Sequence, residues 1–318
     1  MFVSRVQRLA AFARVTALFS VAAATTVCGG RAEPLLRYPV IYADMDGTLL
    51  GSDGKVRSAT VEALRRFRAC GGHVGVATGR TLDQVRPYLD ELEPDLPLVL
   101  LNGAMIATPD GERVTSTETL SAEIVKTVVE SSAHAVGVIG LVAIYPFGAV
   151  ADRDDPRLRA SLESAAIDVV ETCDFADCLD SVSAERSSGP PLKLMVVAEP
   201  AAAEGAAKTA ADAAGGGAQV TLSNPAHGVI EVTPAAAGKA NAVARVLRER
   251  GIGPDEILVF GDGENDAEML GAFPAGVAMG NCHRTTCDAA LLVTKDADTD
   301  AIARVIEALA IRHACGNK

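Results

Sequence analysis

Short apolar runs recur along the chain, and most of them end abruptly in polar residues or glycine. Runs of this length without alternation indicate strands that are buried on both faces. These runs occupy residues 40–43, 73–77, 98–101, 257–260, 276–279 and 291–293. Segments with helical periodicity separate several of them. Strands that alternate with helices predict an α/β fold built on a doubly wound, mainly parallel sheet.

The expected helices follow from the three-to-four-residue spacing of apolar positions. Ser58 is a plausible N-cap for a helix whose inward face carries Val61, Leu64 and Phe67. Further helices are expected from about Thr81, over 239–250 and over 301–311. Each of these helices lies next to a predicted strand, as the α/β fold requires.

The stretch over about 104–222 is too long to be a simple connection. It contains its own predicted elements, namely a helix over 121–130, a strand, turn and strand over 135–151, a strand over 192–198, an alanine-rich helix over 200–214 and a strand over 219–222, which another over 229–232 follows. Residues 177–191, rich in serine and charge, are expected to form an exposed loop. We therefore predict an inserted α+β cap domain of residues 104–222 within a core of residues 34–103 and 223–318.

Polar side chains follow the predicted strands at the point where each strand ends. These residues are Asp44, Thr78, Asn102, Asp262 and Asn281. In a doubly wound sheet, ligands bind in the crevice outside the carboxyl ends of the strands. Five strand ends that offer polar groups to one crevice therefore indicate a binding or catalytic site there.

Two carboxylates stand at the first of these strand ends. Asp44 and Asp46 are two residues apart and point the same way if the extended geometry continues. Gly47 lets the chain turn directly after them. Neighbouring carboxylates repel unless a cation or a proton lies between them. The pattern alone fits either a metal-assisted nucleophile or an acidic turn after a strand.

The charge balance narrows the class of partner. The 318 residues include 29 Lys and Arg against 41 Asp and Glu, a net charge of −12. A nucleic-acid-binding protein normally presents a basic face, so no nucleic-acid partner is expected. No G-x-G-x-x-G sequence follows the first strand, which disfavours a dinucleotide-binding oxidoreductase.

Seven cysteines are present, and two pairs share the same spacing. Cys173 and Cys178 are separated by four residues, as are Cys282 and Cys287. Zinc sites can use such spacing, but no pair of histidines accompanies either one. Buried free cysteines that pack as small hydrophobic side chains are the favoured interpretation.

Residues 1–33 differ in composition from the rest of the chain. Arg5, Arg8 and Arg14 precede the first acidic residue, Glu33, and the apolar run 15–27 is shorter than the ~20 residues that span a bilayer. This leader fits a secretory signal peptide and an organellar transit peptide equally well. An uncleaved extension on a cytoplasmic protein is the third alternative. No stable membrane span is expected elsewhere, because glycine and proline break the apolar run over 135–151.

Four motifs follow one another in a fixed order, namely Asp44-Met45-Asp46-Gly47-Thr48, Thr78-Gly79-Arg80, Lys239 at a helix start, and Gly261-Asp262-Gly263-Glu264-Asn265-Asp266. Together they resemble the haloacid dehalogenase (HAD) superfamily, and within it the Cof-type sugar-phosphate phosphatases. The resemblance covers Tyr38 to about Ile311. Met45 replaces the usual Leu, and Gly238 and Ala240 flank Lys239 where Ser and Gly are common. The long insertion between the second and third motifs is similar to the branch whose cap lies there.

The resemblance implies a Rossmann-like core with a cap that closes over it, and hydrolysis of a phosphomonoester through an aspartyl-phosphate. Asp44 would be the nucleophile, and Asp46 the general acid and base. Magnesium (Mg²⁺) would be held by Asp44, the backbone carbonyl of Asp46, Asp262 and Asp266. Phosphate would be bound by Thr78, Gly79, Lys239 and Asn265, with Arg80 and Asn102 as substrate-orienting residues. The expected partner is a small phosphorylated metabolite.

Two alternatives share the same motifs. A phosphometabolite-binding protein could keep the fold without turnover, although Asp44 and Asp46 are both present. A phosphotransferase could pass the phosphoryl group from the same aspartyl-phosphate to an acceptor other than water. The particular phosphomonoester and the oligomeric state are left open by the sequence.

Overall fold

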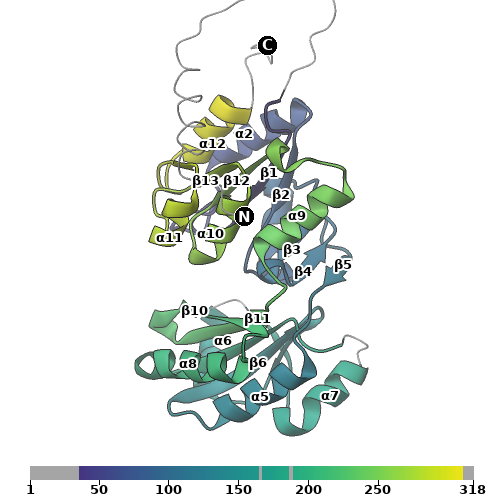
Figure 1. Cartoon of the computed structure of the whole chain (residues 1–318), viewed down its shortest axis with the longest axis vertical. Coiled ribbons are helices and arrows are strands. Elements are labelled where there is room, and N and C mark those ends of the chain that lie inside the picture. The colour runs from purple at the N-terminus through teal and green to yellow at the C-terminus, as the bar shows by residue number, and fades with distance from the viewer. Residues whose placement is uncertain (1–35, 165–166, 186–188, 311–318) are drawn as a thin grey trace, which may run out of the picture. The chain divides into compact units, whose positions relative to one another are not determined.

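The computed structural model describes residues 36–164, 167–185 and 189–310. These fall into two compact units, one formed by the residues up to His73 together with those from Gly253 onward, the other by Val74–Ile252 (Figure 1). The leader predicted over residues 1–33 lies outside the described residues. Within the described ranges, no helix is both long and apolar enough to cross a membrane. The boundaries 34–103, 104–222 and 223–318 stay a prediction.

A parallel sheet forms the centre of the first unit. Its strand order is β14-β13-β12-β1-β2. The strands are β1 (Val40–Ala43), β2 (His73–Val76, which begins at the end of this unit), β12 (Ile257–Gly261), β13 (Ala275–Ala278) and β14 (Leu292–Val293). β1 pairs in parallel with β12, β12 with β13, and β13 with β14. Every residue of β1, β12 and β13 is buried, as the unbroken apolar runs predict.

Helices surround this sheet. They are α2 (Ser58–Ala69), η6 (Pro254–Glu256), η7 (Glu264–Asp266), α10 (Ala267–Ala272), α11 (Arg284–Ala289), α12 (Ala301–Val305) and η8 (Ile306–Ala310). Figure 1 shows α2 beside α12, although they lie far apart in the sequence. Val61, Leu64 and Phe67 are buried on α2 as predicted. The predicted cap is wrong, because Ser58 is already helical and Arg57 is the N-cap residue.

A six-stranded sheet forms the larger part of the second unit, in the order β10-β11-β9-β6-β7-β8. The strands are β6 (Val138–Tyr145), β7 (Gly148–Ala151), β8 (Val169–Thr172), β9 (Lys193–Ala198), β10 (Ala218–Asn224) and β11 (Val229–Pro234). All of its pairings are antiparallel except β7 with β8. The helices that pack against it are α5 (Ala122–Ala133), α6 (Pro156–Ser164), α7 (Phe175–Glu185) and α8 (Ala203–Ala214), the last preceded by η4 (Pro200–Ala202). Strands and helices thus segregate as in the α+β arrangement predicted here.

One face of this sheet carries its apolar core. Leu194, Val196, Ile230 and Val232 point to that face and cluster with buried residues of α5, α7 and α8. Figure 1 shows α5 and α8 next to each other. Because side chains alternate along a strand, the residues between these four point to the opposite face.

The helix α7 corrects the loop predicted over 177–191. Phe175, Leu179 and Val182 lie at positions i, i+4 and i+7, and all three are buried in the core beneath the sheet. This apolar stripe outweighs the serine and charge content of the segment, because a helix needs only one face to be apolar. α6 and β8 were also not predicted from the pattern.

A three-stranded antiparallel sheet completes the second unit, in the order β3-β4-β5. Its strands are β3 (Leu98–Leu100), β4 (Met105–Ala107) and β5 (Val114–Thr117), and the remaining helices of the unit are α3 (Leu82–Val85), η2 (Arg86–Tyr88), α4 (Leu89–Leu92), η3 (Leu101–Gly103), η5 (Pro225–His227) and α9 (Lys239–Glu249). The run 98–101 was expected in the parallel sheet, but its strand pairing with that sheet is limited in the described residues to an isolated parallel bridge between Val99 and Ala77, the residue after β2, and β3 pairs with β4 instead. Positive φ angles at Leu101, Asn102 and Gly103 reverse the chain, so β4 returns along β3.

The paired cysteines are disulfides, which corrects the expectation of free thiols. Cys173 is bonded to Cys178 and Cys282 to Cys287, and Cys70 is also disulfide-bonded. The Cα atoms of the two pairs are 6.2 and 5.7 Å apart, within the range that a disulfide spans. In each pair, the helix that contains the second cysteine turns it back toward the first.

Candidate active site

Three carboxylates converge at the carboxyl edge of the parallel sheet. Asp44 follows β1, and Asp262 follows its parallel neighbour β12. The N–H of Asp44 donates to the carbonyl of Phe260 (3.0 Å), so the two strand ends stay paired up to the site. Asp44, Asp262 and Asp266 each offer a carboxylate oxygen, and these atoms all lie within 4.8 Å of one another. The first two positions flank the point where the strand order reverses direction, where such folds bind ligands.

Asp266 is held by its own loop. Its Oδ2 accepts hydrogen bonds from the backbone N–H groups of Asp262 and Gly263, both at 3.0 Å. The residue is fully buried. Hydrogen bonds to a charged acceptor are stronger than neutral ones, so this carboxylate fixes the conformation of the loop that carries Asp262.

Asp262 is oriented by two side chains from other loops. Thr48 Oγ1 donates to Asp262 Oδ1 (2.7 Å), and Asn281 Nδ2 donates to Asp262 Oδ2 (3.0 Å). Asn281 Nδ2 also donates to the Gly47 carbonyl (2.8 Å), and its Oδ1 accepts from the N–H of Ala297 (3.1 Å). Neither Thr48 nor Asn281 was assigned a role from the sequence, although Asn281 was one of the five polar residues expected at the crevice. Their signal was present in the sequence, since Thr48 belongs to the first motif and Asn281 follows a strand.

Gly47 is required by this geometry. Its φ is +70°, a region that favours glycine. A Cβ at this position would overlap the carboxylate of Asp262. The turn after Asp46 can therefore pass close to Asp262 only because residue 47 has no side chain.

A disulfide lies behind the Asp262 loop. The N–H of His283 donates to the Asp262 carbonyl (2.8 Å), and Thr286 Oγ1 donates to the Gly263 carbonyl (2.5 Å). Both donors lie between Cys282 and Cys287, which are bonded to each other. The disulfide thus closes the short segment that supports the loop.

The donor set fits a hard divalent cation. All three convergent groups are carboxylates, and Mg²⁺ and Ca²⁺ prefer oxygen ligands. Asp44 and Asp266 are buried, so their charges are poorly screened by solvent. Asp46 is exposed and is not part of the cluster. The resemblance assigns the backbone carbonyl of Asp46, and not its side chain, to the metal. This assignment stays a prediction.

The other predicted site residues lie in the second unit, apart from Asn265, which is exposed on η7. Thr78 is buried, and its N–H donates to the Val99 carbonyl (2.9 Å). Its own carbonyl accepts from the N–H of Asn102 (2.9 Å), and its Oγ1 accepts from the N–H of Arg80 (3.2 Å). The loop from Thr78 to Arg80, here called the TGR loop, is therefore bonded to the turn at Asn102.

Arg80 is anchored to the helices that follow it. Its Nη1 donates to the Gln84 carbonyl (3.1 Å), and its guanidinium lies 5.3 Å from the ring centre of Tyr88. Such a cation–π contact favours a fixed side-chain orientation. These contacts favour a structural role for Arg80 in shaping the TGR loop.

Lys239 is the first residue of α9, and it is only 2% exposed. The residue before it, Gly238, packs against Gly103, where a Cβ would overlap the Gly238 backbone. The helix start therefore lies against the turn that carries Asn102. A helix N-terminus that presents a lysine is a favourable environment for an anion.

The fold and these motifs define a class of α/β proteins that carry an acidic cluster at the carboxyl edge of a parallel sheet. The family of haloacid dehalogenase-like hydrolases matches residues 41–306, and the chain belongs to it. The predicted membership of the HAD superfamily, in its Cof-type branch, is confirmed by this match and by the relatives.

Three similar proteins illustrate the range of relatives. The chain is 29% identical over 242 residues to an HMP-PP phosphatase of Cronobacter sakazakii, with 75% of this chain and 82% of that protein covered. It is 24% identical over 286 residues to the chloroplastic endoribonuclease YBEY of Arabidopsis thaliana, where 85% of this chain spans only 46% of that protein. The solved structure of the HAD subclass IIB sugar phosphatase BT4131 matches with a TM-score of 0.70 at 24% identity, covering 84% of this chain and 97% of that one.

Proposed function

We propose that this protein is a Mg²⁺-dependent phosphatase that hydrolyses a small phosphomonoester, in the first instance a sugar phosphate. The observation that carries the proposal is the convergence of Asp44, Asp262 and Asp266 within 4.8 Å at the carboxyl edge of the parallel sheet. Two of these carboxylates are buried, so they need a cation or a proton to be stable together, and a bound divalent cation meets this need. Bound Mg²⁺ would offset part of their charge and of the charge of a phosphate group.

Asp44 is the nucleophile in this proposal. Its carboxylate oxygen attacks phosphorus, and the bond between phosphorus and the leaving-group oxygen breaks, which leaves an aspartyl-phosphate. A water molecule then attacks the phosphorus of that intermediate. Inorganic phosphate leaves and the carboxylate is restored, so one difficult step is divided into two easier ones.

Asp46 transfers the protons. It protonates the leaving alkoxide in the first step and accepts a proton from the attacking water in the second. Its exposure suits this function, because the group must exchange protons with the leaving group and with water. Gly47, which follows it, keeps the turn close to Asp262.

Phosphate binding is assigned to Thr78, Gly79, Lys239 and Asn265. Thr78 can offer a hydroxyl, Gly79 a backbone N–H, Lys239 a positive charge at a helix start, and Asn265 an amide. Arg80 is proposed to orient the TGR loop, and Asn102 to orient the substrate. The six-stranded sheet and its helices would supply the leaving-group contacts, as a cap does when it excludes water from a site.

The relatives support this substrate class, but their names do not agree on one compound. One similar protein is an HMP-PP phosphatase and another is a sugar phosphatase. Both names describe small phosphorylated metabolites as substrates. We therefore propose a metabolite of this size as the partner, with a sugar phosphate as the first compound to test.

The test is phosphate release from a panel of phosphomonoesters, with Mg²⁺ and with a chelator. Wild type, Asp44→Asn and the control Glu268→Gln are compared, since Glu268 is an exposed carboxylate two residues after Asp266. We expect Mg²⁺-dependent release in wild type and the control, and none above background in Asp44→Asn. Recovery of a phosphorylated acceptor in place of inorganic phosphate would instead identify a phosphotransferase. No turnover by a folded, Mg²⁺-loaded protein would favour a binding protein.

A further inference from the structure

Two charged side chains lie on the face of the six-stranded sheet opposite its apolar core. Lys193 begins β9, and Glu231 lies in the neighbouring strand β11. Glu231 is paired with Met195, so Lys193, two residues earlier, is its diagonal neighbour on the same face. Lys193 Nζ lies 2.9 Å from Glu231 Oε1, and the side chains are 4% and 18% exposed.

A buried ion pair of this kind needs an explanation beyond stability. Removing two charges from water is costly, and well-packed apolar side chains often stabilise a fold as well or better. Apolar residues occupy most of the neighbouring positions in both strands. The hydrogen bonds that Lys193 and Glu231 make to other segments indicate the role of the pair.

Both members of the pair contact the predicted phosphate-binding region. Lys193 Nζ donates to the Gly79 carbonyl (3.4 Å), and Asn102 Nδ2 donates to Glu231 Oε2 (3.4 Å). The N–H of Asn102 donates in turn to the Thr78 carbonyl (2.9 Å). The contacts form a closed ring that joins β9, β11, the TGR loop and the turn at Asn102.

We propose that Lys193 and Glu231 are positioning residues for phosphate binding. Lys193 fixes the peptide between Gly79 and Arg80 by binding its carbonyl, and Glu231 fixes the side chain of Asn102. Together they set the direction of the Thr78 hydroxyl and the Gly79 N–H. This inference rests on the proposed function, because it assigns these two loop groups to the phosphoryl group of the substrate.

The ring also reaches the helix that carries Lys239. The turn at Asn102 continues into Gly103, which packs against the Gly238 backbone directly before Lys239. A displacement of Asn102 would therefore disturb two of the segments that we assign to phosphate binding. The position of β9 and β11 therefore determines the position of the groups that we assign to phosphate binding.

The double variant Lys193→Met/Glu231→Leu separates positioning from stability. Apolar replacement of both partners avoids leaving one buried charge unpaired, so the midpoint of thermal unfolding should stay close to that of wild type. The KM for the best ester and the inhibition constant for inorganic phosphate should both rise about tenfold, the effect of losing one hydrogen bond to a charged group. Glu231→Gln keeps the side-chain shape and should raise both constants about threefold.

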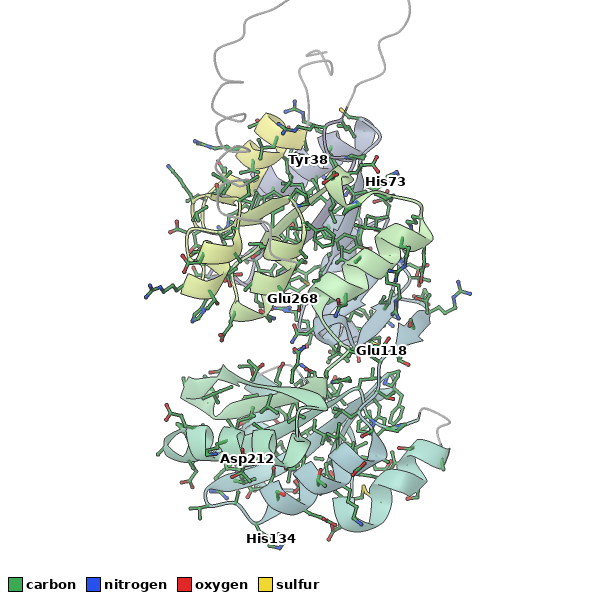
Figure 2. The ribbon with its side chains drawn as sticks, in the orientation of Figure 1. Tyr38, His73, Glu118, His134, Asp212 and Glu268 are labelled. Carbon is green, nitrogen blue, oxygen red and sulfur yellow. A yellow bond between two sulfur atoms is a disulfide. The ribbon has the colours of Figure 1, made fainter. Side chains whose placement is uncertain are left out.

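The matched control is Arg245→Met/Glu118→Leu. Arg245 Nη1 and Glu118 Oε1, the latter on a residue labelled in Figure 2, form an ion pair of 3.1 Å in the same unit. This pair bridges α9 and the residue after β5, and neither side chain belongs to the ring. The control should leave the phosphate inhibition constant within twofold of wild type.

Either of two results would overturn the inference. One is a folded double variant whose KM and phosphate inhibition constant match those of wild type. The other is a Glu231→Gln variant that matches wild type when the double variant does not fold. If wild type hydrolyses no ester, the proposed function fails on its own, and calorimetric titration of the Mg²⁺-loaded variants with inorganic phosphate still tests the positioning pair.

Discussion

Asp266→Asn should make the metal-free protein more stable and should reduce the stability that Mg²⁺ adds. Three carboxylate oxygens lie within 4.8 Å of one another, and two unit charges at that distance repel by about 3.5 kcal/mol at an effective dielectric constant of 20. Asp266 takes part in two of the three pairs. Asp262 is partly exposed, so solvent weakens its share, and we expect a net gain of about 1–3 kcal/mol in the absence of metal.

The substitution is nearly isosteric, so it changes the charge of residue 266 more than its packing. An amide oxygen can still accept the N–H groups of Asp262 and Gly263. With metal present, wild type should gain about 2.7 kcal/mol at a Mg²⁺ concentration 100 times its dissociation constant. The variant, with one fewer anionic ligand, should gain less. The stability advantage of the variant in chelator should therefore shrink as Mg²⁺ is added.

Thermal unfolding measured in chelator and in a series of Mg²⁺ concentrations tests this reasoning without any substrate. A gain of about 2 kcal/mol corresponds to a rise of about 4–8 °C in the unfolding midpoint for a domain of this size. Glu268→Gln is the control, because it removes an exposed carboxylate (labelled in Figure 2) close in sequence to Asp266. The cluster is not a metal site if wild type unfolds at the same temperature in chelator and in Mg²⁺, and Asp266→Asn brings no gain in chelator.

Three further substitutions test the support of the cluster. Thr48→Val removes the hydroxyl that donates to Asp262 and should weaken Mg²⁺ binding about tenfold, as measured by calorimetric titration. Gly47→Ala should abolish Mg²⁺-dependent phosphate release, because the added methyl group overlaps the Asp262 carboxylate. Cys282→Ser, which opens the disulfide to Cys287, should lower Mg²⁺ affinity by several-fold at most, since the hydrogen bonds behind the loop remain; this too is read by titration.

Each of these has a matched control. Thr48→Ser keeps the hydroxyl and should bind Mg²⁺ as wild type does. Gly54→Ala has the same φ of +70° but no atom within 4 Å, so it isolates backbone strain from the overlap. Cys173→Ser opens the other disulfide, in the second unit, and should leave Mg²⁺ affinity unchanged. Equal effects of a test variant and its control would contradict the corresponding assignment.

Much of the fold followed from the sequence because its signals are local. The apolar runs that became β1 and β12 are buried along their whole length, and the helical stripe of α2 faces inward as predicted. A turn or a buried strand depends mainly on neighbouring residues. The run 98–101 was correctly predicted as a strand but assigned to the wrong sheet, because strand pairing depends on residues that are distant in the chain.

The same distinction holds at the site. The sequence by itself determined that Asp44 and Asp262 each follow a strand, and so placed both at one edge of a sheet, whereas Asp266 was expected there only from the family resemblance. Only the tertiary structure showed that Asn281 and Thr48 orient Asp262, and that the cysteines are joined. The sequence shows Lys193 and Glu231 as charged residues inside apolar strands. Only the structure shows that the two side chains form an ion pair. The physical reason is that conformation along the chain is decided by adjacent residues, whereas hydrogen bonds, ion pairs and disulfides between distant residues form only where packing brings their atoms within reach.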